Sequence, residues 1–133
     1  MEITGRKAIV LGGTSGIGLA TSIMLVGKGA SVVAVSRDPS KAGDVPDGIR
    51  LAALDTRNES DVQAFFEAEG KIDILVNSAT GGSRAFGPFL EMDMQGFRGS
   101  FDKLWGYANV VRHGAPHVAD DGAIVLVLSL IHI

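Results

Sequence analysis

Short apolar runs alternate with segments of helical periodicity along almost the whole chain, and this alternation limits the possible folds most. Five runs, at residues 7–11, 31–35, 49–54, 73–77 and 123–128, are rich in apolar or β-branched residues and have the length of a buried strand. Between most of them, apolar residues recur every three or four positions, as they do on one face of a helix. Such alternation predicts an α/β fold, a parallel sheet with helices on both faces.

The connections narrow this prediction further. Right-handed crossovers between parallel strands leave few topologies, and the doubly wound, Rossmann-type order 3-2-1-4-5, truncated after the fifth strand, is expected. The segment 38–48 contains Pro39 and Pro46, so we expect a loop with at most one helical turn. Asp120-Asp121-Gly122 is expected to form a turn before the fifth strand.

Three helices are expected. The first covers about residues 16–26, and the second follows a cap at Asn58 or Ser60. One long helix is predicted from six apolar residues at helical spacing: Phe97, Phe101, Leu104, Trp105, Ala108 and Val111. The same spacing places four phenylalanines in the core: Phe65, Phe66, Phe97 and Phe101.

A glycine-rich stretch, residues 11–18, joins the first strand to the first helix. Glycines permit a tight turn and a close approach of phosphate oxygens, and the amino end of a helix attracts anions through its free N–H groups. The stretch therefore predicts a site for the diphosphate of a dinucleotide, formed by Gly12, Thr14, Ser15, Gly16, Ile17 and Gly18. The alternative is a glycine-rich turn with a structural role alone.

Gly12, Gly16 and Gly18 are in register with the Thr-Gly-x-x-x-Gly-x-Gly loop of the short-chain dehydrogenase/reductase family, which the sequence resembles. Leu11 stands where the family usually has threonine. The resemblance implies that Asp55, with Thr56 beside it, contacts the adenine. It also implies that residues 77–80 correspond to the family's Asn-Asn-Ala-Gly motif, which makes three of them candidate cofactor-binding residues: Asn77, Ser78 and Ala79.

The end of the second strand bears on the choice of cofactor. An acidic residue there would bind the ribose 2′-hydroxyl of NAD and repel a 2′-phosphate, but this chain has Ser36 followed by Arg37. A guanidinium is well shaped to bind phosphate, so NADP(H) is favoured over NAD(H). The alternative is that Arg37 only pairs with Asp38 at the surface.

The family's chemistry uses a Tyr-x-x-x-Lys pair, and this motif is absent from the chain. The single tyrosine, Tyr107, is followed four residues later by Val111. Lys103 occupies the position at which many family members have an asparagine, and Ser129 lies about where the resemblance places the catalytic serine. The resemblance implies an NADP(H)-dependent oxidoreductase acting on a carbonyl or alcohol, here a cofactor-binding fragment without turnover. The alternative is a non-catalytic NAD(P)-binding or sensing module.

Residues 1–127 are interpreted as one NAD(P)-binding domain, incomplete at its carboxyl end. The tail at residues 128–133, Leu-Ser-Leu-Ile-His-Ile, is the translation of the transposase mosaic-end adapter used in sequencing libraries, so we interpret it as non-native. Under that interpretation Ser129 does not belong to the site. The competing interpretation is a native strand end.

Composition excludes several classes of protein. The net charge of −3 argues against a nucleic acid or an anionic membrane as partner, and no apolar run approaches the roughly 20 residues of a membrane helix. The absence of cysteine excludes thiolate metal sites and fits a cytoplasmic protein. No metal site is predicted, because His113 and His117 lack an obvious third ligand. The resemblance implies a small-molecule substrate and a homo-oligomer for a full-length parent.

Overall fold

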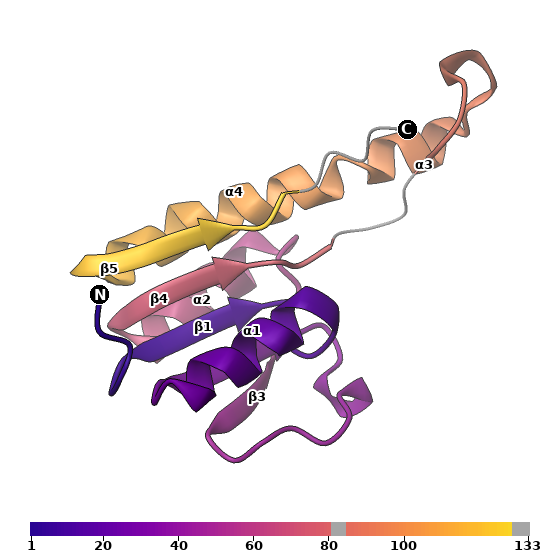
Figure 1. Cartoon of the computed structure of the whole chain (residues 1–133). Helices are drawn as coiled ribbons and strands as arrows, with labels where there is room; N and C mark the ends of the chain where they lie inside the picture. The colour runs from indigo at the N-terminus through magenta and orange to yellow at the C-terminus, as the bar shows by residue number, and fades with distance from the viewer. Residues whose placement is uncertain (81–84, 129–133) are drawn as a thin grey trace.

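The structure, a computed structural model, describes residues 1–80 and 85–128 and has a five-stranded sheet at its centre (Figure 1). All pairings are parallel, and the strand order is β3-β2-β1-β4-β5. The strands are β1 (Lys7–Leu11), β2 (Ser31–Ser36), β3 (Ile49–Ala53), β4 (Ile72–Asn77) and β5 (Val118–Leu126). The predicted fold class and strand order are confirmed.

Helices cover both faces of this sheet. Helix α1 (Gly16–Gly27) lies on one face, and α2 (Glu59–Glu69) and α4 (Asp102–Gly114) lie on the other, as Figure 1 shows. Leu25 of α1 packs with Val10 and Val32 in one buried cluster. Phe66 of α2 and Val110 of α4 pack with the opposite side chains of β1 in a second cluster. Residues 8–11 are fully buried because both faces of β1 are covered.

The short elements follow the sequence signals closely. Asn58, rather than Ser60, caps α2, because its side chain accepts a hydrogen bond from the N–H of Asp61. The segment between β2 and β3 contains one short 3₁₀ turn, Pro39–Lys41, as predicted. Two further 3₁₀ turns, Phe89–Glu91 and Ala115–His117, precede α3 (Met94–Gly99) and β5.

The prediction of one continuous helix from Phe97 to Val111 was wrong. The segment is divided into α3 and α4 at residues 100–101. At the division the N–H of Phe101 bonds to the carbonyl of Arg98, three residues back, so the helix tightens there. Gly96, Gly99 and Ser100 are weak helix formers, which explains the location of the break.

The face of α4 that meets the sheet is not the one next to Phe101, for which a core position was predicted. Phe101, Leu104 and Trp105 are 47, 59 and 63% exposed, whereas the residues that face the sheet are Gly106, Tyr107, Val110 and Gly114. A Cβ at Gly106 would lie 2.7 Å from Thr56 Oγ1, and one at Gly114 would lie 2.7 Å from a methyl carbon of Leu75. At these two positions the helix packs too close to its neighbours for any side chain, so glycine faces inward there. The core position expected for Phe101 is therefore incorrect.

The predicted turn at Asp120-Asp121-Gly122 lies within β5 instead. The strand begins at Val118, and its pairing with β4 shifts register between Ile72 and Ile74, which pair with Val118 and Ala123. Gly122 fits this irregularity because a Cβ there would lie 2.5 Å from the carbonyl oxygen of Asp73. The carboxylate of Asp121 pairs with Arg6, at 2.6 Å from its Nη2.

Candidate functional site

The candidate site lies at the carboxyl ends of β1 and β4. From β1 the chain enters α1 on one face of the sheet, and from β4 it proceeds to α3 and α4, the latter on the opposite face (Figure 1). In doubly wound sheets this reversal leaves a crevice between the two neighbouring strands, and ligands bind there.

The glycine loop packs directly against the loop that follows β4. Gly12 has a φ of +77°, which favours glycine, and a Cβ there would lie 2.8 Å from the backbone nitrogen of Ala79. A Cβ at Gly18 would collide with the carbonyl group of Gly12 and would lie 2.6 Å from Ser78 Oγ. The glycines at these two positions therefore allow the loop to pass between α1 and β4.

The amino end of α1 borders a cavity of about 320 Å³. Ser15 occupies the N-cap position but makes no side-chain hydrogen bond to the helix, and the first N–H groups of a helix have no partner within it. A Cβ at Gly16 would meet no other atom within 4 Å, so the space in front of this residue is open. The cavity is lined by Gly12, Ser15, Gly16, Ile17, Gly18, Ser78, Thr80, Lys103 and Val127.

The structure thus brings seven of the candidate residues to one cavity and adds two that the sequence analysis did not single out, Thr80 and Val127. Ser78 also has a structural role, since its hydroxyl donates to the carbonyl of Leu11 at 3.0 Å. Thr56 lies against α4, where its carbonyl accepts a hydrogen bond from Asn109 at 3.0 Å. Ser129 lies outside the described residues, as does most of the tail, so the interpretation of both stays a prediction.

A second group of candidates lies at the carboxyl ends of β2 and β3. Ser36 pairs with Ala53 in the sheet, and its buried hydroxyl has no hydrogen-bond partner among the described residues. Arg37 follows it and is exposed, with no ion pair in the described part of the chain. The alternative pairing with Asp38 does not occur, because Ser40 and Lys41 bind that carboxylate.

Asp55 is held in place by Arg57, which the sequence analysis missed. Arg57 Nη2 lies 2.7 Å from Asp55 Oδ2, and Nε lies 2.9 Å from Oδ1. This guanidinium lowers the pKa of Asp55 to about 2, and the charge of Arg37 contributes in the same direction. The carboxylate is therefore ionised at neutral pH and oriented at the same edge of the sheet as Ser36.

Tyr107 joins the carboxyl ends of β4 and β5. Its hydroxyl oxygen lies 2.9 Å from the carbonyl oxygen of Asn77 and 2.6 Å from that of Val127, and it donates its proton to this pair. Burial raises the pKa of Tyr107, so the hydroxyl stays protonated at neutral pH. Asn77 is itself fully buried, and its side-chain oxygen accepts a hydrogen bond from the N–H of Ala79.

We expect Tyr107→Phe to lower the free energy of unfolding by about 1–2 kcal/mol, because two partly buried carbonyl groups lose a donor. The measurement is urea denaturation, with a lower midpoint at an unchanged slope. Trp105→Phe is the matched control on the outer face of the same helix, with an expected change within about 0.5 kcal/mol. An equal effect of the two substitutions would contradict the role of the hydroxyl.

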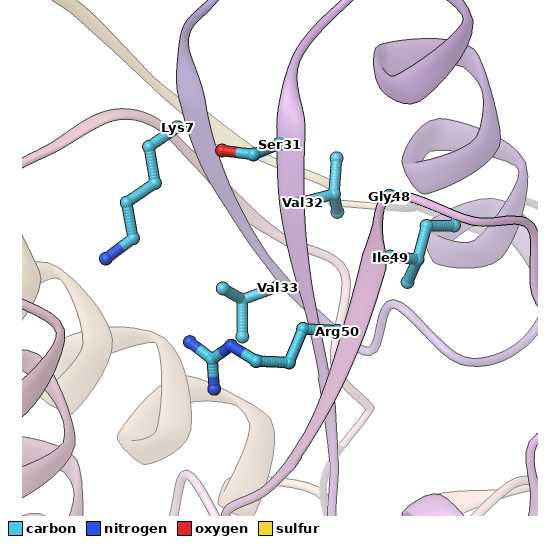
Figure 2. Close-up of a pocket in the computed structure, with 7 residues that line it drawn as sticks. All are labelled: Lys7, Ser31, Val32, Val33, Gly48, Ile49 and Arg50. Carbon is cyan, nitrogen blue, oxygen red and sulfur yellow. The ribbon is translucent and has the colours of Figure 1, made fainter.

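A larger hollow, of about 440 Å³, lies at the opposite edge, at the amino ends of β1, β2 and β3. Figure 2 shows the side chains of Lys7 and Arg50 extending to the same side of these strands. Both cations pair with Glu69: Lys7 Nζ lies 2.9 Å from its Oε2, and Arg50 Nη2 lies 2.5 Å from its Oε1. Both cations already share a carboxylate partner, and ligands of such sheets bind at the carboxyl ends of the strands, so this hollow is not the candidate site.

The described residues contain no cluster of three or more histidine, aspartate or glutamate side chains arranged to hold a metal ion. His113 instead contacts Glu59, with 3.0 Å between Nε2 and Oε1, and the ring of His117 stacks on Phe66. In the part of the chain that the structure describes, none of the helices combines the length and the apolar character needed to cross a bilayer.

A family model described as short chain dehydrogenase matches residues 6–132. The chain belongs to the short-chain dehydrogenase/reductase family. Among curated members of the family, it is similar to L-xylulose reductase of Mesocricetus auratus, with 32% identity over 97% of this chain and 55% of that protein. The chain spans about half the length of the relatives it matches.

Solved structures of family members agree with the fold. A short chain dehydrogenase from Burkholderia cenocepacia J2315, in complex with NADP, has a TM-score of 0.85 and 29% identity over 97% of this chain and 55% of its own. A 3-ketoacyl-(acyl-carrier-protein) reductase from Brucella melitensis, complexed with NADH, has a TM-score of 0.75. Its sequence is 31% identical over 86% of this chain and 51% of its own. Similar folds in this family have therefore been captured with either dinucleotide.

Proposed function

We propose that the chain binds a nicotinamide dinucleotide and supplies the cofactor-binding half of an oxidoreductase that acts on a small carbonyl or alcohol substrate. The cavity at the amino end of α1 carries this proposal. The glycine loop leaves open space in front of Gly16, and the unpaired N–H groups of the first turn of α1 are suitable donors for a diphosphate. When bound, the cofactor would supply hydride transfer.

The residues of the chain would then have distinct roles. Gly12, Ser15, Gly16, Ile17 and Gly18 would hold the diphosphate, with Thr14 as a further hydroxyl donor. Asp55 would orient the adenine, and Asn77, Ser78 and Ala79 would form the floor of the site beside the loop. Thr56 is proposed only as a backbone support for this edge, since its carbonyl is bound by Asn109.

The proposed preference is for NADP(H). Arg37 is exposed at the end of β2, next to the unpartnered hydroxyl of Ser36. The guanidinium of Arg37 can donate hydrogen bonds to a 2′-phosphate, and its positive charge would attract the phosphate. Thermal melting of the chain with NADPH, with NADH and without ligand tests binding and preference together, because a ligand that binds only the folded state raises the midpoint. The absence of a shift with either ligand would refute the proposed function.

We expect Arg37→Ala to weaken NADPH binding by about tenfold or more, since a charge-assisted hydrogen bond contributes about 1.5–3 kcal/mol. Binding of NADH should change less than about twofold, because it has no 2′-phosphate. Isothermal titration calorimetry with both ligands measures this. Arg112→Ala is the control, since it removes the same charge from an exposed position at the end of α4. An equal loss for both ligands would contradict the assignment of Arg37.

The 133-residue chain is proposed to bind without turnover. It contains no Tyr-x-x-x-Lys motif, and its single tyrosine, Tyr107, donates its hydroxyl proton to backbone carbonyls instead of facing the cavity. These two observations also favour the second candidate, a nucleotide-binding or sensing module. A steady rate of NADPH oxidation by this chain with a carbonyl compound would refute the absence of turnover.

Association with a second copy is proposed as well. Phe101 at the N-cap of α4 and Leu104 and Trp105 within it form an apolar, exposed face, which supports a homo-oligomer built on this helix.

A further inference from the structure

Lys103 brings a positive charge to the wall of the cavity at the amino end of α1. It lies in the first turn of α4, and among the described residues that line the cavity it is the one with a charged side chain. Its ammonium group lies 5.3 Å from the ring centroid of Tyr107, one turn further along the helix. Because the Tyr107 hydroxyl is bound at the ends of β4 and β5, this ring is a fixed support for the lysine.

The charge of Lys103 has no anionic partner in the described part of the chain. The neighbouring carboxylate, Asp102, pairs with Arg57 at 3.4 Å. The described residues include no carboxylate that pairs with Lys103, in contrast to Lys7 and Lys41, which pair with Glu69 and Asp38. An unpaired ammonium group on a residue that lines the same cavity as the positive end of the α1 dipole adds to a local field that attracts anions.

We propose that Lys103 is a cofactor-binding residue whose ammonium group pairs with the diphosphate of the bound dinucleotide, an inference that rests on the proposed function. The nicotinamide and its ribose carry no negative charge, and the 2′-phosphate is assigned to Arg37 at the end of β2. The diphosphate is therefore the anionic part of the ligand that both the α1 amino end and Lys103 would attract. A neutral side chain at this position would leave the helix amino end as the main source of positive charge.

The experiment compares a ligand that contains a diphosphate with one that lacks it. NADPH contains the diphosphate, whereas adenosine 2′-monophosphate has the adenosine and the 2′-phosphate but lacks it. Calorimetric titration measures the Kd of both ligands for the unmodified chain and for the variants Lys103→Met, Lys103→Gln and Lys103→Arg. Lys28→Met is the control, because Lys28 is an exposed residue at the carboxyl end of α1. Far-ultraviolet circular dichroism and unliganded melting identify which neutral variant keeps the fold.

We expect the neutral variants to raise the Kd of NADPH by about 10- to 100-fold, the range of a charge-assisted hydrogen bond to phosphate. Lys103→Arg should restore the affinity to within a few-fold, and the affinity for adenosine 2′-monophosphate should not change. The salt dependence of NADPH binding should also become weaker in the neutral variants. Lys28→Met should behave as the unmodified chain.

Two results would overturn the inference. One is an unchanged Kd of NADPH in a folded neutral variant, and the other is an equal loss of affinity for both ligands. Failure of the unmodified chain to bind NADPH or NADH would instead refute the proposed function itself. Since titration contains no substrate, binding of a substrate anion by Lys103 cannot produce the expected result.

Discussion

Gly18→Ala is expected to lower the free energy of unfolding by about 3 kcal/mol and to abolish binding of NADPH. The added Cβ would collide with the carbonyl group of Gly12. This group is part of the backbone, so a change of side-chain rotamer cannot relieve the collision. Relief requires that α1 moves away from the glycine loop, and this movement would separate the N–H groups of the first turn from the cavity. For a domain of this size the melting temperature should fall by roughly 10 °C.

Gly27→Ala is the matched control, because it makes the same substitution at the other end of the same helix. Gly27 is exposed, and a Cβ there would meet no atom within 4 Å. Alanine is the better helix former, so this variant should be more stable by up to about 1 kcal/mol and should bind NADPH normally. Similar melting temperatures for the two variants would contradict the close contact between Gly18 and Gly12.

Phe66→Ala is expected to lower the free energy of unfolding by about 3–5 kcal/mol, a large part of the 5–15 kcal/mol typical of a domain. Phe66 is fully buried and belongs to the cluster between the sheet, α2 and α4. Its ring meets Phe65 edge-on at 5.4 Å and approaches Gly114 so closely that a Cβ there would lie 2.9 Å from Cζ. Deletion of the ring leaves a cavity that the packed helices cannot close.

Chemical denaturation of Phe66→Ala and of Phe89→Ala tests this expectation. Phe89 also contacts another aromatic ring, Phe97, but it is 61% exposed, so its loss should cost less than about 1 kcal/mol. Equal denaturation midpoints for the two variants would show that the second cluster is not the principal core on this face of the sheet.

Local patterns were sufficient for the fold class, because each strand and helix signal depends on residues close together in the chain. The runs at 7–11, 31–35 and 73–77 matched β1, β2 and β4 to within one residue. Asn58 was among the predicted caps because a cap acts within its own first turn. The strand order followed from the right-handed crossover rule and the usual order of doubly wound sheets.

Long-range packing explains the error in the position of Phe101. The apolar spacing of Phe101, Leu104 and Trp105 indicated a helix face correctly but did not show which face meets the sheet. That choice depended on the close approach of Gly106 to Thr56 and of Gly114 to Leu75, contacts between residues far apart in sequence. The spacing of Gly106, Val110 and Gly114, each four residues apart, was the available signal for a closely packed helix.

The features of the candidate site also divide into those that local sequence determines and those that depend on packing. The sequence by itself determined the glycine loop and its place between a strand and a helix, because both are local properties of residues 7–27. Tertiary structure alone decided that Lys103 shares a cavity with this loop and that Tyr107 joins two strands. These contacts join segments up to about a hundred residues apart, and their geometry depends on how the helices pack on the sheet.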